Sequence, residues 1–208
     1  MIDQRTTEWF AQRLGKVTAS RIADLMARTK TGYSTSRENY MAQLICERLT
    51  GVPQDSYSNA AMQWGTDQEP FARAAYEAHA GVLVEECGFI PHPTIDDAGA
   101  SPDGLVGDDG LVEIKCPNTA TMLDFILTES VPDKYQKQMQ FQLACTGRSW
   151  CDFVMFDPRL PEGGQLRIKR IERDNVFIAQ IETEVSAFLK EALIKTEAIK
   201  EKLNAGQV

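Results

Sequence analysis

Residues 101–117, with the sequence SPDGLVGDDGLVEIKCP, constrain the fold of this chain more than any other stretch. Two apolar Leu-Val pairs, at 105–106 and 111–112, enclose a segment rich in glycine and aspartate at 107–110. Apolar runs that flank Gly and Asp residues are typical of a β-hairpin with a tight turn. The stretch therefore predicts two antiparallel strands.

Side chains on a strand alternate between its two faces, so the second strand of the hairpin separates its residues by chemistry. Val112 and Ile114 share a face that can enter a core, and Glu113 and Lys115 share the opposite face. Asp103 lies on the partner strand, where the hairpin can bring it close to Glu113. The prediction is a small cluster of two carboxylates and one ammonium group.

Such a cluster can hold a divalent metal ion. The carboxylates of Asp103 and Glu113 and the backbone carbonyl of Ile114 are hard oxygen ligands, which suit Mg²⁺ or Mn²⁺. A metal-bound water is more easily deprotonated, and Lys115 could orient that water or stabilise a charged transition state. The alternative is an acidic turn followed by a solvated strand face, because alternating charges are common on strands. An EF-hand is excluded, because its ligand spacing and its glycine are absent.

Charge is distributed unevenly along the 208 residues, which carry a net charge of −8. Residues 1–48 contain eight Lys/Arg against five Asp/Glu, whereas residues 49–208 contain 14 against 25. A local basic excess can steer a phosphate backbone while the acidic remainder suppresses binding elsewhere. A charged surface without special meaning explains the same numbers equally well.

The five cysteines form no Cys-x-x-Cys pair, which argues against a structural zinc site or an iron–sulfur cluster. With no signal-like N-terminus, we expect reduced thiols in a cytoplasm. No run of 18 apolar residues is present, so no membrane span or membrane partner is expected.

The remaining pattern predicts helices on both sides of the hairpin in sequence. We expect polar loops at 29–36 and 53–60, and a capping box formed by Thr66 and Glu69 at the start of a long helix. Short strands are expected at 82–86 and 89–91. The later elements are helices near 121–127, 132–145 and 175–203 and strands at 150–156 and 165–171. This order predicts an α/β fold with a central mixed β-sheet flanked by α-helices.

At this point the sequence resembles a known family. The string Ser101-Pro-Asp-Gly followed by Glu113-Ile-Lys-Cys-Pro is similar to the Pro-Asp…Asp/Glu-x-Lys nuclease superfamily, and more narrowly to the phage lambda-type exonucleases, the YqaJ-like viral recombinases. The resemblance covers roughly residues 8–175 and implies one nuclease domain over 1–208 with a restriction-endonuclease-like core. Four further blocks agree in order: Arg13-Leu-Gly-Lys-Val-Thr-Ala-Ser20, Trp64-Gly65…Glu69, Tyr135…Gln138 and Asp157-Pro-Arg159.

The resemblance implies roles for individual residues. Asp103, Glu113 and the Ile114 carbonyl would hold Mg²⁺, with Mn²⁺ as an alternative and two ions expected. Glu69 would assist as a third acid, unless its carboxylate only caps its helix. Lys115 would position and activate water, and Gln138 would support it, although a face of glutamines is usually only solvated.

DNA-binding roles follow from the same resemblance. A 5′-phosphate pocket is implied at Arg13, Ser20 and Ser101. Thr18 and Ser20 also lie near a predicted helix start, where their hydroxyl groups could be ordinary N-caps. DNA contacts are implied at Lys30, Met62 and Tyr135, of which Met62 could equally be packing against its neighbours.

The implied function is a Mg²⁺-dependent 5′→3′ exonuclease that digests one strand of a double-stranded DNA end and leaves a 3′ overhang for recombination. The implied partners are a single-strand annealing protein and two further copies of the chain in a ring-shaped trimer. The implied location is the cytoplasm of a bacterial or phage-infected bacterial cell. Two alternatives stay open: an endonuclease of the same superfamily, and a DNA-end-binding module without catalysis.

Overall fold

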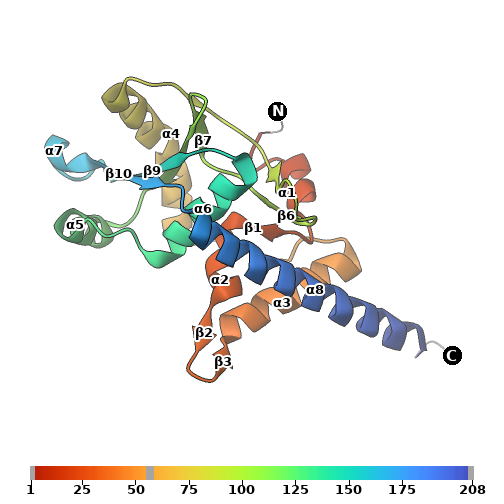
Figure 1. Ribbon diagram of the computed structural model, residues 1–208. Coiled ribbons are helices and arrows are strands. Elements are labelled where there is room, and N and C mark those ends of the chain that lie inside the picture. Colours follow the sequence, from red (N-terminus) through yellow and green to blue (C-terminus); the bar gives the residue numbers. More distant parts are fainter. Residues whose placement is uncertain (1–2, 55–58, 206–208) are drawn as a thin grey trace.

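The predicted hairpin lies in the middle of a mixed five-stranded sheet (Figure 1). The computed structural model describes residues 3–54 and 59–205. In the hairpin Leu105 pairs with Leu111, as the sequence predicts. β8 and β9 run parallel and the other neighbours antiparallel, so the predicted mixed sheet is confirmed. The strand order is β10 (Leu166–Glu172), β9 (Trp150–Phe156), β8 (Gly110–Lys115), β7 (Gly104–Val106) and β4 (Val84–Glu85).

Helices cover the two faces of this sheet, and successive side chains of β8 pack against one face and then the other. Val112 and Ile114 pack with Tyr76 in an apolar cluster between the sheet and α4. Leu111 points to the opposite face, in a larger cluster that includes Phe125. The covering helices are α4 (Ala60–Ala80) on one face, and α5 (Thr119–Thr128) and α6 (Asp133–Thr146) on the other.

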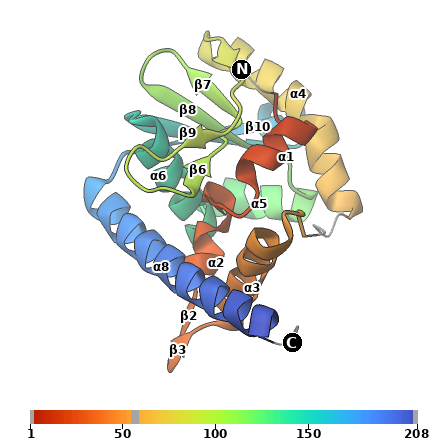
Figure 2. The ribbon, with the colours of Figure 1, turned by 90° about the vertical axis from the view of Figure 1, so that its right-hand side faces the viewer.

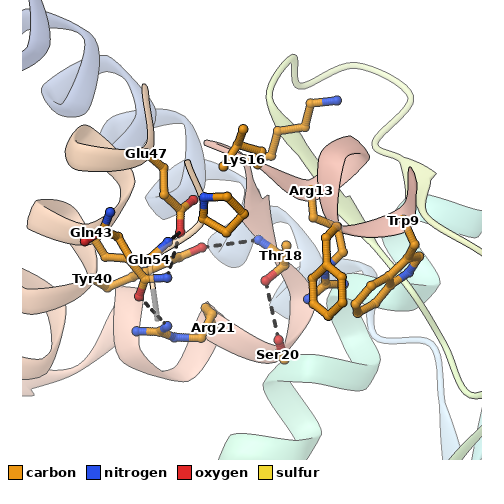
Figure 3. Close-up of a pocket in the computed structure, with 13 residues that line it drawn as sticks. Trp9, Arg13, Lys16, Thr18, Ser20, Arg21, Tyr40, Gln43, Glu47 and Gln54 are labelled. Atoms are coloured by element: carbon orange, nitrogen blue, oxygen red, sulfur yellow. Dashed lines mark hydrogen bonds between the residues drawn. The ribbon is translucent and has the colours of Figure 1, made fainter. Parts of the chain in front are cut away.

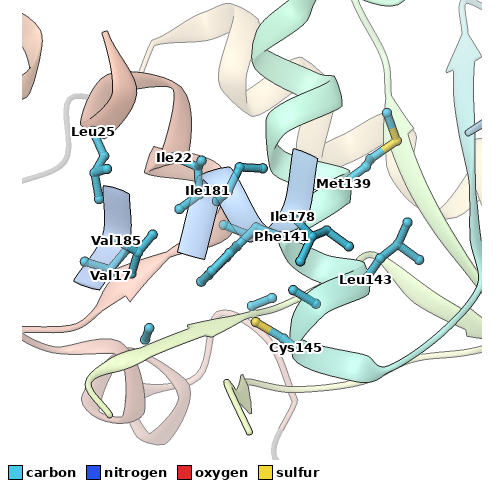
Figure 4. Close-up of a cluster of buried hydrophobic side chains, with 14 of the residues drawn as sticks. Val17, Ile22, Leu25, Met139, Phe141, Leu143, Cys145, Ile178, Ile181 and Val185 are labelled. Atoms are coloured by element: carbon cyan, nitrogen blue, oxygen red, sulfur yellow. The ribbon is translucent and has the colours of Figure 1, made fainter. Parts of the chain in front are cut away.

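The larger cluster extends from the sheet into a layer built by both ends of the chain. α8 packs against α2, α3 and α6, and both ribbon views show it lying across them (Figures 1 and 2). Ile22 of α2, Phe141 of α6 and Ile181 of α8 meet in this core (Figure 4). The helices of this layer besides α6 are α1 (Thr7–Arg13), the 3₁₀ turn η1 (Ala19–Arg21), α2 (Ile22–Met26), α3 (Thr35–Thr50) and α8 (Asn175–Ala205).

A second sheet has three very short strands that the sequence pattern only partly indicates. Its order is β1–β6–β5, with β1 parallel to β6. Val17 and Thr18, just before the predicted helix start, therefore form a strand. The strands are β1 (Val17–Thr18), β5 (Ile90–Pro91) and β6 (Ala98–Ala100).

The expected polar loop at 29–36 is wrong, because a small hairpin occupies its first half. β2 (Arg28–Thr29) pairs with β3 (Gly32–Tyr33), and the hairpin projects from the body of the protein (Figure 1). Arg28 ties the hairpin to α8, because its guanidinium lies over the Tyr33 ring and donates to Glu184 of α8 at 2.6 Å.

The predicted capping box at Thr66 and Glu69 is also wrong. α4 begins at Ala60, where Asn59 Oδ1 accepts a hydrogen bond from the Met62 N–H at 2.9 Å. Asn59 therefore caps the helix, and Glu69 lies within it.

The expected loop at 53–60 falls partly on residues 55–58, outside the described residues. A four-residue helix, α7 (Glu162–Gln165), lies between β9 and β10. In the part of the chain that the structure describes, every helix is too short or too polar to span a bilayer.

Gly110 begins β8 under the Trp150 ring, and a Cβ there would lie 2.2 Å from that ring. We expect Gly110→Ala to lower the free energy of unfolding by about 1–3 kcal/mol, the usual cost of overpacking, measured by urea denaturation. Gly163→Ala is the control, because a Cβ at Gly163 meets no atom within 4 Å. Equal stability of the two variants would contradict this view of the turn.

Candidate active site

The carboxylate of Glu113 is the centre of the predicted cluster. Glu113 is 1% exposed, and its carboxylate accepts hydrogen bonds from two side chains of α6. Gln138 Nε2 donates to Oε1 and Gln142 Nε2 to Oε2, both at 2.6 Å. The Lys115 ammonium also contacts Oε1, so Glu113 and Lys115 share a face as predicted. Three donors therefore hold one buried acid in a fixed orientation.

Asp103 joins this cluster from the start of the hairpin. Its Oδ2 accepts the backbone N–H of Ile114 at 2.7 Å, which places the carboxylate beside β8. Burial, with the negative charge of Glu113 as the next contribution, raises the pKa of Asp103 to about 8. The two acids therefore repel each other in the absence of a further cation.

Lys115 is the cation within the cluster. Burial acts to lower the pKa of Lys115, but the carboxylates of Glu113 and Asp103 outweigh it and hold that pKa above its ordinary value. Lys115 therefore stays protonated. Burial, with the charge of Glu69 next, raises the pKa of the neighbouring Cys116 thiol to about 12, so Cys116 is not a thiolate ligand.

A cavity of about 500 Å³ opens onto these groups. Met62 and Tyr135, both predicted as DNA contacts, lie on its wall with Asp103 and Lys115. The Lys115 Nζ also lies 5.5 Å from the centre of the Tyr135 ring. The structure thus brings both predicted contacts to the predicted acids.

Glu69 lies on the wall of the same cavity but is bound to two arginines. Its Oε2 accepts from Arg5 Nη2 at 2.6 Å and its Oε1 from Arg73 Nη2 at 3.3 Å. Since Asn59 caps α4, the alternative role of Glu69 as a helix cap is excluded.

A second cavity, of about 230 Å³, contains two of the three predicted phosphate-binding residues (Figure 3). Arg13 and Ser20 line it, and Ser20 lines the first cavity too. Arg13 Nη1 donates to Ser101 Oγ at 3.2 Å, and Trp9 Nε1 donates to the same oxygen at 3.0 Å. Ser101 lines neither cavity, but its bond to Arg13 connects it to the second one.

The N-cap role that the sequence allows for the Thr18 hydroxyl is not found. Thr18 belongs to β1 and its side chain makes no capping bond, so its hydroxyl is not an N-cap. Instead its Oγ1 lies 3.4 Å from Ser20 Oγ. α2 has only five residues, too few for the electrostatic effect of a long helix. Anion binding here would depend on side chains.

Some residues fall outside the predicted set or away from the site. Lys30 lies exposed at the turn of the β2–β3 hairpin and lines neither cavity. Gln142, which lies four residues after Gln138 on α6, was assigned no role from the sequence. Its spacing of one helical turn from Gln138 was the available signal. Trp9 and Arg5 had no sequence signal, because their contacts depend on distant parts of the chain.

The residues present fit a hard divalent cation. Asp103 is bonded to β8 near Glu113, Ile114 lines the same cavity as Asp103, and the repulsion between the two acids is what a bound cation would relieve. Within residues 3–54 and 59–205 no three His, Cys, Asp or Glu side chains form a ready-made metal cluster. Two carboxylates, one carbonyl and several waters match Mg²⁺, which keeps waters, better than a metal that needs a full set of protein ligands.

The chain is similar to known proteins in both sequence and fold. The sequence profile of the YqaJ-like viral recombinase domain matches residues 8–149. Among solved structures, an alkaline exonuclease, LHK-Exo, from Laribacter hongkongensis is 58% identical, with a TM-score of 0.90 over 96% of this chain and 99% of that chain. A structure of LHK-Exo in complex with dAMP shows 59% identity and a TM-score of 0.91 over the same shares.

A phage-related exonuclease from Haemophilus somnus 129PT is 17% identical, with a TM-score of 0.72 over 90% of this chain and 96% of that chain. At this identity the likeness concerns the fold alone. No curated protein matches the sequence.

Metal affinity should depend on pH through Asp103. Because its pKa is raised to about 8, the carboxyl is mostly protonated below that pH, and binding of a cation must release the proton. We expect the affinity for Mn²⁺ to rise about tenfold per pH unit up to about pH 8 and to level off above it. Calorimetry in buffers of different ionisation enthalpy measures both the affinity and the proton release. Affinity that is constant between pH 6 and 8 would refute this role of Asp103.

Gln142→Leu should lower the free energy of unfolding by about 1.5–3 kcal/mol, because Glu113 loses one donor to a buried charge. Gln136→Leu is the matched control on the same helix, since Gln136 is exposed and donates only to the Val131 carbonyl. Chemical denaturation compares the two variants. A loss no larger than that of the control would show that Gln142 does not support Glu113.

Proposed function

The chain belongs to the YqaJ-like viral recombinase family, and we propose that it digests one strand of a DNA duplex end from 5′ to 3′ with Mg²⁺. That it is a DNA exonuclease rests on the profile match and on its identity with an alkaline exonuclease over nearly the whole chain. The metal, the direction of digestion and the 3′ overhang are the finer parts of the proposal.

The observation that carries the proposal is the cluster of Asp103, Glu113 and Lys115, of which Asp103 and Lys115 line an open cavity. A binding module needs no buried acid pair, because acids repel the phosphate backbone. Asp103, Glu113 and the Ile114 carbonyl would hold Mg²⁺ or Mn²⁺, with Glu69 near a second ion. A bound ion would supply an activated water and offset negative charge at the phosphate.

The residues of the chain would do the rest. Lys115 would act as a charged donor that orients the attacking water or stabilises the transition state. Gln138 and Gln142 hold Glu113 in one rotamer and so keep Lys115 in place. This preorganisation is what makes such a site effective, since little reorientation is needed at the moment of reaction.

The direction of digestion would follow from the second cavity. Ser101, which accepts from Arg13, lies two residues before Asp103 along the chain. A terminal 5′ phosphate bound by Arg13, Ser20 and Ser101 would place the first internal phosphodiester at the acids. Burial lowers the pKa of the Arg13 guanidinium to about 10, which leaves it charged at neutral pH. The structure of a relative, LHK-Exo, in complex with dAMP, a mononucleotide of the kind that an exonuclease releases, supports a nucleic-acid substrate.

The wider setting of the proposal rests on the family resemblance. It comprises a ring-shaped trimer around double-stranded DNA, a single-strand annealing protein as partner, and the cytoplasm of a bacterial or phage-infected cell. Lys30, on the projecting hairpin, would contact the duplex away from the cavities.

Asp103→Ala and Glu113→Ala should abolish Mg²⁺-dependent digestion of linear duplex while the protein stays folded by circular dichroism. Lys115→Ala should lower the rate by about 10²–10³-fold with DNA binding retained. The wild type should not cut closed circular duplex DNA. Cutting of that substrate would favour the endonuclease alternative. Near-normal turnover by either acid variant would refute the site.

Arg13→Ala should reduce the preference for 5′-phosphorylated over 5′-hydroxyl ends. A charge-assisted hydrogen bond contributes about 1.5–3 kcal/mol, so the preference should fall roughly 10- to 100-fold. Initial rates on matched duplexes with the two kinds of end measure it. An unchanged preference would remove Arg13 from the pocket.

A further inference from the structure

The residues before α1 form an N-terminal arm, residues 3–6, that is fixed against the candidate active site. Gln4 Nε2 donates to the Pro102 carbonyl at 2.7 Å and to the Cys87 carbonyl at 2.9 Å. Pro102 directly precedes Asp103, so the arm is bonded to the segment that carries this acid. The arm therefore has a defined position beside the cavity.

Arg5 extends from this arm into the wall of the cavity. Its side chain lines the cavity with Asp103 and Lys115 and is 51% exposed. Arg5 Nη2 donates to Glu69 Oε2 at 2.6 Å, and among the described residues Glu69 is its one hydrogen-bond partner. A guanidinium has five N–H donors in a rigid fork, so several donors stay available on the solvent side.

Stability does not explain this arrangement. The backbone of Arg5 has φ of 68°, a left-handed conformation that is unfavourable for arginine and is often found at functional sites. An ion pair as exposed as that of Arg5 with Glu69 adds little to folding. Glu69 already pairs with the more buried Arg73. The arm thus holds a strained residue for a small gain in stability.

Electrostatics indicate what Arg5 would bind. A DNA strand that reaches Asp103 and Glu113 brings phosphates toward two acids, which repel them. Of the residues described around the cavity, two are cations, and Lys115 is already bound to Glu113. Arg5 is the more exposed of the two and carries the fork that matches phosphate oxygens.

We propose that Arg5 binds an internal phosphate group of the DNA strand in this cavity, with Glu69 orienting its guanidinium. The proposal deepens the function proposed above and rests on it. Arg13 and Ser101 would hold the terminal 5′ phosphate, whereas Arg5 would act on a phosphodiester and so would not distinguish the two kinds of end.

The test compares Arg5→Gly and Arg5→Lys with the wild type. Glycine adopts a positive φ freely, so Arg5→Gly removes the side chain without disturbing the arm. Binding of a blunt duplex is measured by fluorescence anisotropy in EDTA, which prevents cutting, over a range of salt concentrations. We expect Arg5→Gly to weaken binding about 10- to 100-fold and to reduce the salt slope by about one, with the slope restored in Arg5→Lys.

Arg167→Ala is the control, because it removes one positive charge from β10, where Arg167 lines neither cavity. It should leave affinity and slope near those of the wild type. An unchanged salt slope in Arg5→Gly with slower digestion in Mg²⁺ would overturn the proposal, since Arg5 would then act only through Glu69. A smaller preference for 5′-phosphorylated ends in Arg5→Gly would overturn it as well. A wild type that binds duplex but never digests it would refute the proposed function and leave the binding comparison valid.

Discussion

The burial of the Glu113 carboxylate is the constraint on which the rest of this structure depends. A charge at 1% exposure is stable only with several hydrogen bonds and an opposite charge, and Lys115, Gln138 and Gln142 supply them. The two glutamines belong to α6, so this helix must pack on the face of the sheet that carries Glu113. The opposite face is then left for α4, which carries Glu69 and Met62. The buried acid thus ties α6 to its own face of the sheet, and α4 packs on the other face through apolar contacts.

The two cavities are bounded by different elements. The larger is bounded by the sheet, α4, α6 and the N-terminal arm, so that its acids come from separate elements. The smaller is bounded by α1, β1 and α3, and its donors are side chains instead of helix ends (Figure 3). Ser20 lies on both walls. The two cavities are therefore neighbours that share this serine.

Local sequence signals predicted the parts of this site that local physics determines. Strand alternation was enough to place Glu113 beside Lys115, and helical spacing placed Gln138 and Gln142 on one face. The predicted start of α4 was wrong because Gly65 and Pro70 are residues that usually interrupt a helix, whereas the actual N-cap, Asn59, lies well upstream. The three-stranded sheet has strands of two or three residues, too short for any period to show. Arg5 and Glu69 are 64 residues apart, so only the fold brings them together.

The layer formed by α8 affects how the protein is made. Synthesis proceeds from the N-terminus, and the arm, the hairpin and α6 leave the ribosome first. The core beneath α2 and α3 nevertheless needs Ile181, Val185 and Phe188, which come from the last helix (Figure 4). A nascent chain that stops at β10 leaves that apolar surface exposed to water. The apolar core beneath α2 and α3 is therefore complete only when α8 packs against it.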